Sequence, residues 1–377
     1  MFKEKNKQRT IIAFMNSFSS GKSGGDMVFI EIAKRLVDFS IIVVTSKLGS
    51  KLCKENNLQV KFVITTKENA FKNTILIYIK RIFIGLFVKI TITQDTLFLG
   101  TSDFLPDVLP IILLKQRSKN TKWIQHIFHL IPKERKISFY SQKLSFAIIK
   151  KYADLVIVDN NLLKDDLIKL GFQKHKVVLN YPGLNIEYLK TIKQSTTNKF
   201  YDAIVMAQLR KSKGIFDLVE IWSMVCKIIP NAKLGIIGKG TEDVLDAIKT
   251  TIKNYSLEQN IDILGFLPND QAFQIINNSK IFTTPSYEEG FGIAALEAQT
   301  LGLPIVAWAL PIFDEIFPQG MITVKIGDKN SFAKEIVKLL TEKDLYKKLS
   351  LSAEINAKRF NWDYTAEKEK LLINSIY

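Results

Sequence analysis

The chain has 377 residues, of which 47% are hydrophobic and 24% are charged. This length exceeds one ordinary core and fits two domains, and the apolar content excludes a disordered chain. The formal net charge is 53 − 37 = +16, which favours anionic partners such as nucleic acid, acidic lipid surfaces or phosphorylated substrates. Residues 2–10 are polar and form no secretory signal, and neither Cys53 nor Cys226 lies in a metal or redox pattern, so we expect a cytoplasmic protein.

The first elements are a predicted strand, Ile11–Met15, a glycine loop and a predicted helix over 27–37. Gly24 and Gly25 in the loop let backbone approach a ligand closely, and ligands of open α/β sheets bind at such strand ends. The loop has neither the P-loop spacing nor G-x-G-x-x-G. A ligand-binding loop and a generic surface loop both remain open.

Strand-like apolar runs then recur between helical stretches, which predicts an α/β fold with a parallel, doubly wound sheet. They cover 41–45, 60–65, 96–100, 123–128, 155–158 and 177–179. Alternation in the fourth run puts His126 on one face with Ile124 and Phe128, whereas His129 opens the following loop. For either histidine, a role in a cleft and an ordinary core hydrogen bond both remain open.

Residues 71–90 are apolar but are interrupted by Lys80, Arg81 and Lys89. They therefore lack the ~20 consecutive apolar residues of a transmembrane helix. Two interpretations remain: a buried helix of the first domain, which is favoured, or a basic amphipathic segment resting on an anionic bilayer.

A Thr-, Lys- and Asn-rich stretch at 190–199 is a predicted hinge, after which the pattern restarts with the strand Ala203–Met206. The basic loop 207–214 precedes a predicted helix, and both a diphosphate-binding loop and a solvated basic turn remain open for it. Gly238 and Gly240 end the next strand as a G-x-G loop, which alone is a weak motif.

The most informative stretch is 281–304, which reads as strand, glycine loop, helix and strand. Glu289 lies in the loop and Glu297 lies in the helix, where spacing puts it on the apolar side with Ile293 and Ala294. Burying an unpaired carboxylate costs several kcal/mol, and the two hydroxyls of a ribose would satisfy it. A core Lys or Arg is the alternative partner.

The run Pro285-Ser-Tyr-Glu-Glu-Gly-Phe-Gly-Ile-Ala-Ala-Leu-Glu-Ala298 resembles the E-x7-E signature of the retaining glycosyltransferases of family GT4, which have the GT-B fold. A weaker resemblance extends over most of the chain. It implies two Rossmann-like doubly wound domains facing across a cleft. We expect an acceptor-binding domain over 1–185, a nucleotide-sugar-binding domain over 200–356, and a C-terminal helix, 357–377, that crosses back to the first domain.

The resemblance also implies roles for residues. Glu289 would lie by the donor sugar and Glu297 would hold the nucleotide ribose. Lys213 would bind the diphosphate. The family's Arg position holds Gln208, so either Arg210 replaces the missing charge or phosphate is held more weakly. The other implied positions are His126 or His129 beside the reacting sugar, and Gly24, Gly25, Gln208, Gly238, Gly240, Phe266, Leu267, Gly290, Phe291 and Gly292 around the substrates.

These roles imply transfer of a hexose from a nucleotide-diphosphate sugar to a hydroxyl of a saccharide or lipid-linked acceptor, with retention of configuration and without metal or cofactor. Synthesis of cell-surface polysaccharide or glycoconjugate at the inner face of the membrane is the expected setting, with peripheral contact to anionic lipid. No nucleic-acid partner is expected, since its signatures are absent. A sugar-nucleotide epimerase of the same fold and a non-catalytic basic subunit supporting a partner glycosyltransferase are the alternatives.

Overall fold

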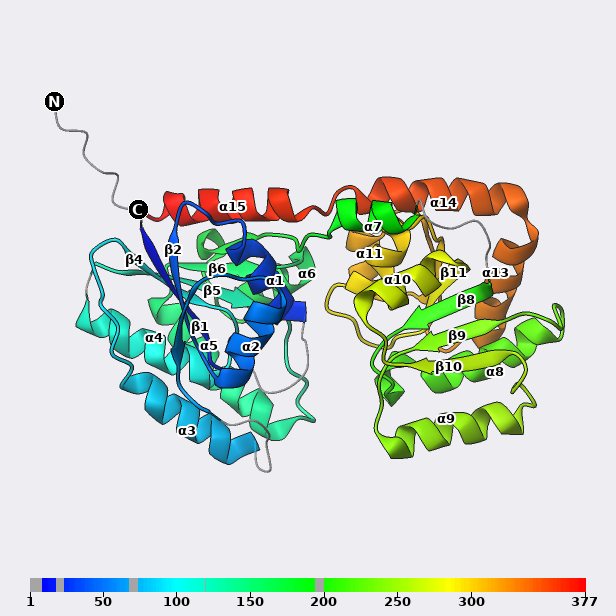
Figure 1. Ribbon diagram of the computed structural model, residues 1–377, viewed down its shortest axis with the longest axis horizontal. Helices are drawn as coiled ribbons and strands as arrows, with labels where there is room; N and C mark the ends of the chain where they lie inside the picture. Colours follow the sequence, from blue (N-terminus) through cyan, green and yellow to red (C-terminus); the bar gives the residue numbers. More distant parts are fainter. Residues whose placement is uncertain (1–8, 18–23, 68–73, 119, 194–199) are drawn as a thin grey trace. The chain divides into compact units, whose positions relative to one another are not determined.

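The chain folds into two compact units, each a parallel sheet with helices on both faces (Figure 1). The first unit comprises residues up to Gly183 together with Trp362–Tyr377, and the second comprises Leu184–Asn361. The predicted doubly wound α/β class is therefore confirmed for both halves of the chain. The computed structural model describes residues 9–17, 24–67, 74–118, 120–193 and 200–377.

The sheet of the first unit has seven parallel strands in the order β3-β2-β1-β4-β5-β6-β7. Order reverses at β1, so the chain winds first to one side and then to the other, and its helices are divided between the two faces. The strands are β1 (Thr10–Met15), β2 (Ser40–Thr45), β3 (Lys61–Ile64), β4 (Thr96–Gly100), β5 (Lys122–Ile127), β6 (Leu155–Val158) and β7 (Val177–Leu179).

Two buried clusters cover the two faces of this sheet. Alternate residues of β1 point to opposite faces, so Ile11 joins Val28 and Ile373 in one cluster, whereas Ile12 joins Ile111 and Phe146 in the other. The first face is covered by α1 (Gly24–Ala33), α2 (Lys47–Glu55) and α15 (Trp362–Ser375). The second face is covered by α4 (Leu105–Arg117), α5 (Lys136–Tyr152) and α6 (Asn161–Lys169).

Helix α3 (Thr74–Leu86) packs against α4, where a Cβ on Gly85 would lie 2.7 Å from Pro110. Its inward side also holds Arg81, which is fully buried and donates to the carbonyl of Asn16 at 3.1 Å. The expectation of a buried helix is wrong for the outer side, where Phe83 is 64% exposed. The outer side is exposed because α3 packs against α4 on one side only and no described element covers the other side.

The second unit repeats the plan with six parallel strands in the order β10-β9-β8-β11-β12-β13. One large cluster, including Trp222 and Trp308, fills the space between this sheet and its helices α8 (Ile215–Cys226) and α13 (Lys329–Thr341). The strands are β8 (Tyr201–Met206), β9 (Leu234–Ile237), β10 (Ile261–Gly265), β11 (Ser279–Thr284), β12 (Ile305–Trp308) and β13 (Met321–Val324). The helices are α7 (Ile186–Lys193), α8 (Ile215–Cys226), α9 (Glu242–Asn254), α10 (Asn269–Asn277), α11 (Ile293–Thr300), α12 (Pro311–Ile316), α13 (Lys329–Thr341) and α14 (Lys343–Ala357).

The start of the predicted hinge is helical. Residues 190–193 continue α7, which buries Ile186, Leu189 and Ile192 and packs on α10 and α11. These three apolar residues recur every third position, which is near the helical period, and they outweigh the polar residues between them. The rest of the predicted hinge, 194–199, lies outside the described residues.

Candidate active site

The glycine loop of the second unit runs from the end of β11 to the start of α11. Pro285 ends the strand, and the loop is tied to the short turn Lys211–Lys213 by a hydrogen bond from the Tyr287 N–H to the carbonyl of Ser212 at 2.9 Å. The Tyr287 hydroxyl donates to Asp217 on α8. The loop is therefore fixed at two points to the start of α8, where the basic residues lie.

Gly214 makes this approach possible. It has φ +66°, and a Cβ at this position would lie 1.9 Å from the carbonyl oxygen of Pro285. A residue with a side chain could therefore not sit here without moving backbone. Gly214 ends the basic loop that the sequence pointed to, but its packing against β11 had no sequence signal beyond the glycine itself.

Lys213 and Glu289 form an ion pair. The Lys213 Nζ lies 2.7 Å from Glu289 Oε1 and donates to the carbonyl of Glu288 at 2.9 Å. Their side chains are 14% and 19% exposed, so the pair is shielded from bulk water on most sides. The sequence placed the two residues near the same ligand without predicting their direct contact.

Arg210 lies beside this pair and contacts the neighbouring carboxylate. Its Nη2 lies 3.0 Å from Glu288 Oε1, and both side chains are 41% exposed. The Arg210 Nε is shielded from solvent and has no hydrogen-bond partner among the described residues. Glu288 was missed by sequence reasoning, although the adjacent Glu-Glu pair was visible as its signal. Gln208 is exposed.

Glu297 lies on α11 on the same side as Ile293 and Ala294, and all three are partly exposed. The buried positions of the helix are instead Ala295, Leu296 and 298–300, so the predicted apolar side is a side that the fold leaves partly open. No described residue forms a hydrogen bond or ion pair with the Glu297 carboxyl. Desolvation raises its pKa to about 8 even though the residue keeps some exposed surface. The alternative interpretation, a core Lys or Arg paired with Glu297, is therefore not found among the described residues.

Of the remaining residues of this loop, two glycines can offer backbone N–H groups to a ligand, and one residue has a buried side chain. Gly290 is exposed, and Gly292 adopts φ +88° at the start of α11. Their N–H groups lie next to the first turn of the helix, where an anion is favoured. The Phe291 side chain is instead only 5% exposed and packs edge-on against Phe360, with ring centroids 5.5 Å apart.

The loops after β9 and β10 contain the other predicted positions of the second unit. A Cβ on Gly238 would lie 1.8 Å from the carbonyl of Ala207, and one on Gly240 would lie 3.0 Å from Leu209. Contact with the loop after β8 therefore requires glycine at 238, whereas at 240 a side chain would be in tight contact with Leu209. Phe266 follows β10 and is 73% exposed, whereas Leu267 is half-buried.

In the first unit, the structure places the two histidines differently. His126 is 5% exposed, and its Nε2 lies 2.8 Å from Oε1 of the fully buried Glu369 on α15. The Asn180 side-chain amide donates to Oε2 of Glu369 at 2.9 Å. Of the two interpretations of His126, this network favours the core hydrogen bond. His129 is exposed after β5.

Gly24 and Gly25 open α1 earlier than the sequence predicted, and a Cβ on Gly25 would lie 2.8 Å from the Phe128 ring. Most of the predicted loop before them, 18–23, lies outside the described residues.

Within the described part of the chain, no three His, Cys, Asp or Glu residues are grouped to hold a metal ion. No described helix is long and apolar enough to cross a membrane.

Comparison with known proteins gives a family match and a fold match. Residues 189–355 match the family described as "Glycosyl transferases group 1". An uncharacterized glycosyltransferase of Methanocaldococcus jannaschii is 26% identical over 312 residues, 71% of this chain and 76% of the relative. The alpha-monoglucosyldiacylglycerol synthase of Acholeplasma laidlawii is 28% identical over 253 residues, and the chain spans 63% of that relative's length, with 63% of its own length aligned.

Among solved structures, the crystal structure of Anabaena HepE in complex with UDP and glucose matches with a TM-score of 0.77. The match covers 97% of this chain and 100% of that chain at 17% identity. A likeness at this identity shows the fold, which is GT-B, with its two Rossmann-like domains, as the sequence predicted.

Proposed function

Because residues 189–355 belong to the glycosyl transferases group 1 family, we propose that the protein transfers a hexose from a nucleotide-diphosphate sugar to a hydroxyl of a saccharide or lipid-linked acceptor, with retention of anomeric configuration. The observation that carries the proposal is the placement of three groups around the loop between β11 and α11, with Lys213 supplied by the turn before α8. Lys213 and Glu289 are paired at the loop, and Glu297 has no partner among the described residues on the partly open side of the helix.

Each group has a chemical task in this proposal. Lys213 and Arg210 supply positive charge to the departing diphosphate, and the N–H groups of Gly290 and Gly292 add partial positive charge at the start of α11. No metal or other cofactor is required for this stabilisation. Glu289 orients the donor sugar. Glu297 accepts hydrogen bonds from the ribose hydroxyls, which replaces the water that its surroundings exclude.

The Lys213–Glu289 pair gives the proposal an order of events. A diphosphate competes with the Glu289 carboxylate for the Lys213 ammonium, and Glu289 is then available for a sugar hydroxyl. Binding of donor thus converts an internal ion pair into two contacts with substrate. The exposed Phe266 is placed after β10, where its ring or backbone can meet the nucleobase.

The acceptor and setting are also part of the proposal. A lipid-linked or saccharide acceptor used in cell-surface polysaccharide or glycoconjugate synthesis suits a cytoplasmic enzyme that contacts an anionic membrane peripherally. The relative from Acholeplasma laidlawii, named for synthesis of a glucosylated diacylglycerol, supports the lipid class of acceptor.

A nucleotide-sugar screen by thermal shift, followed by hydrolysis and transfer assays with the best donor, tests the proposal. Glu289→Gln keeps the shape of the side chain but removes its charge, and we expect kcat to fall about 100-fold or more. Lys211→Met is the matched control, because Lys211 is an exposed lysine on the same turn as Lys213. We expect its activity to stay within about twofold of wild type.

Four results would each contradict the proposal. A protein that no nucleotide sugar stabilises is not a donor-binding enzyme. Full activity of a complex containing the Glu289→Gln variant indicates a non-catalytic subunit. Interconversion of epimers without transfer indicates an epimerase, and inversion at the anomeric carbon of the product, read by NMR, contradicts the retaining mechanism.

A further inference from the structure

The loop 285–292 is held in place by contacts of two kinds. In the first kind, its carboxylates pair with cations of the basic turn. Glu289 pairs with Lys213 at 2.7 Å, and Glu288 pairs with Arg210 at 3.0 Å. The proposed function uses both cations for the donor diphosphate, so these pairs are exchanged for contacts with substrate when the donor binds. They therefore do not fix the loop in the state in which the reaction takes place.

The second kind of contact is made by Tyr287 and involves none of the groups assigned to substrate. Its N–H donates to the carbonyl of Ser212 at 2.9 Å, and its hydroxyl donates to Oδ2 of Asp217 in the first turn of α8. The bond to Asp217 raises the pKa of the Tyr287 hydroxyl, so the hydroxyl keeps its proton and remains a donor at neutral pH. Because Tyr287 stands two residues before Glu289, these contacts fix the backbone that carries the Glu289 carboxylate.

Asp217 is in turn held from its other side. The Lys329 Nζ lies 3.0 Å from Oδ1 of Asp217, so the two oxygens of this carboxylate have different partners. The same ammonium lies 2.5 Å from Glu220, one turn further along α8. Lys329 thus offsets the repulsion between two carboxylates at this helical spacing. The side chains of Asp217 and Lys329 are 18% and 27% exposed, so their ion pair is partly shielded from solvent.

The core of the second unit gives Lys329 a fixed position. Lys329 is the first residue of α13, which packs directly on α8. The buried Phe332 of α13 belongs to the same core cluster as Trp222 of α8. The packing of these two helices therefore sets the position of the ammonium, and through it the position of the Asp217 carboxylate.

We propose that Asp217 is a positioning residue of the candidate active site. Through the Tyr287 hydroxyl, it keeps Glu289 beside the donor sugar after the ion pairs of the loop have been exchanged for substrate. Lys329 holds the Asp217 carboxylate in place to accept this hydrogen bond. Neither Asp217 nor Tyr287 contacts the donor in this arrangement, so they act on the geometry of the reaction and not on donor binding. Because this role requires a donor that takes Lys213 from Glu289, it rests on the proposed function.

Steady-state kinetics with the donor found in the nucleotide-sugar screen tests this role. Tyr287→Phe removes the hydroxyl and Asp217→Ala removes its acceptor. We expect each to lower kcat at least about tenfold, since small displacements of reacting groups have large effects on rate. The Kd for the donor, measured by calorimetry, is expected to stay within about threefold of wild type.

Two further variants distinguish the hydrogen bond from a general effect of the substitutions. Asp217→Asn keeps an acceptor oxygen for the Tyr287 hydroxyl, so we expect its kcat to stay within about threefold of wild type. The double variant Asp217→Ala/Tyr287→Phe is expected to lose no more than about twofold beyond the weaker of the two single variants, because both remove the same bond.

Amide hydrogen exchange tests the same bond without any catalysis. Lys213→Met removes the ion pair with Glu289 and so reproduces its loss on donor binding. In that background, we expect Tyr287→Phe to accelerate exchange of the peptide spanning 286–291 at least about fivefold. Unchanged exchange would overturn the proposal, whichever donor the protein uses.

Two matched controls lie elsewhere in the second unit. Tyr255→Phe removes a hydroxyl from a tyrosine that is 42% exposed, against 43% for Tyr287. Asp246→Ala removes a carboxylate that pairs with Lys249 on α9. Both are expected to keep kcat within about twofold of wild type, and urea unfolding checks that every variant is folded.

The outcomes separate the positioning role from the proposed function. A wild-type kcat in Tyr287→Phe, or a loss in Asp217→Ala that Asp217→Asn does not restore, would contradict the positioning role while turnover by the wild-type chain still supports a glycosyltransferase. A wild-type chain that no nucleotide sugar stabilises contradicts the proposed function instead. The exchange experiment then shows by itself whether the Tyr287 hydroxyl holds the loop.

Discussion

At the scale of single residues, the sequence indicated which carboxylates matter but not how they are held. Glu289 and Glu297 stood out by their spacing, because few physical reasons place a carboxylate on the apolar side of a helix. Contact between Lys213 and Glu289 joins residues 76 positions apart. Periodicity is a local property and carries no information on such a pair. The contact depends on the fold, which brings Gly214 against Pro285 and thereby Lys213 next to Glu289.

Glu297 gives a prediction for pH. Its carboxyl has a pKa of about 8 in the folded protein against an ordinary value of 4.5, so the folded state binds the proton more tightly than the unfolded state. The free energy of unfolding therefore falls as pH rises from about 4.5 to about 8. Glu297→Gln removes this loss. On going from pH 5 to pH 8.5, we expect the free energy of unfolding of the variant to rise by about 1–3 kcal/mol relative to that of wild type. This gain is smaller than the full pKa difference would give, because solvent screens a partly exposed residue.

Urea unfolding of both proteins at the two pH values measures the gain. Glu288→Gln is the control, because Glu288 is an exposed carboxylate at the same loop. A difference between wild type and Glu297→Gln that is the same at pH 5 and pH 8.5 would show that this carboxyl does not titrate in that range.

At the scale of elements, buried strands were the most predictable part. Their continuous apolar runs, such as Leu155–Val158, gave bounds that agree with the structure, because strands buried on both faces tolerate few polar residues. Elements that depend on neighbours were less predictable. Helix α3 exposes a side that its composition suggested was buried, and α7 extends into a polar stretch. The sequence does not say which helices have a second layer over them.

The junction between the basic turn and β11 predicts the effect of a single methyl group. Gly214→Ala forces a left-handed backbone on an alanine and places its Cβ against the Pro285 carbonyl, so we expect a loss of about 2–4 kcal/mol in the free energy of unfolding. Gly327→Ala is the matched control, because Gly327 has φ +85° but nothing within 4 Å of the new Cβ. It is expected to lose only about 1 kcal/mol.

Urea unfolding measures both losses, and donor turnover measures a second effect. Movement of the turn away from β11 separates Lys213 from Glu289, so Gly214→Ala is expected to lower kcat as well as stability. Equal stability of the two alanine variants would mean that the contact with Pro285 is not rigid.

At the scale of the whole molecule, the chain consists of two units with separate cores. The large apolar clusters draw their residues from one unit or the other, including the C-terminal residues Trp362 and Ile373 in the first. The repeat of strand, glycine loop and helix predicted this organisation. The prediction that the chain end returns to the first unit came from the family resemblance, since the sequence of α15 does not indicate which unit the helix packs on.

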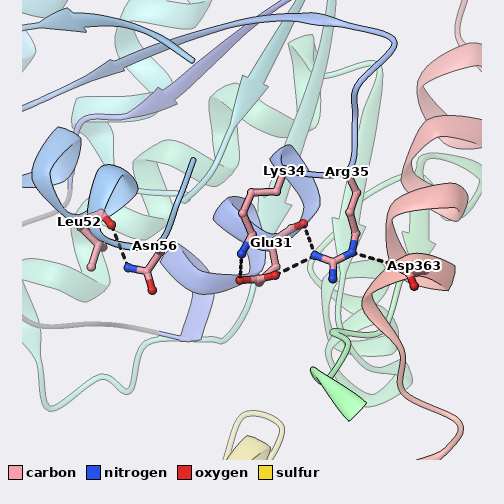
Figure 2. Close-up of polar contacts among 6 residues, drawn as sticks. All are labelled: Glu31, Lys34, Arg35, Leu52, Asn56 and Asp363. Atoms are coloured by element: carbon pink, nitrogen blue, oxygen red, sulfur yellow. Dashed lines mark hydrogen bonds and ion pairs between the residues drawn. The ribbon is translucent and has the colours of Figure 1, made fainter. Parts of the chain in front are cut away.

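Separate cores predict separate responses to mutation. Glu369→Ala leaves the His126 Nε2 buried without its partner and removes one of the two hydrogen bonds that the Asn180 amide donates, so we expect a loss of about 3 kcal/mol confined to the first unit. Amide hydrogen exchange resolved along the chain by mass spectrometry measures where protection falls. Asp363→Ala is the control on the same helix: its side chain is 79% exposed, so loss of the pair with Arg35 in Figure 2 costs less than about 1 kcal/mol.

The reciprocal variant makes the test decisive. Gly214→Ala is expected to accelerate exchange in peptides of the second unit, such as those from β8 and β11, and to leave those of β5 and β7 unchanged. Because two units with independent cores open as separate cooperative units, the two patterns of accelerated exchange should not overlap. Acceleration across both sheets by either substitution would mean that the units unfold as one, and their division into separate cores would then have no energetic meaning.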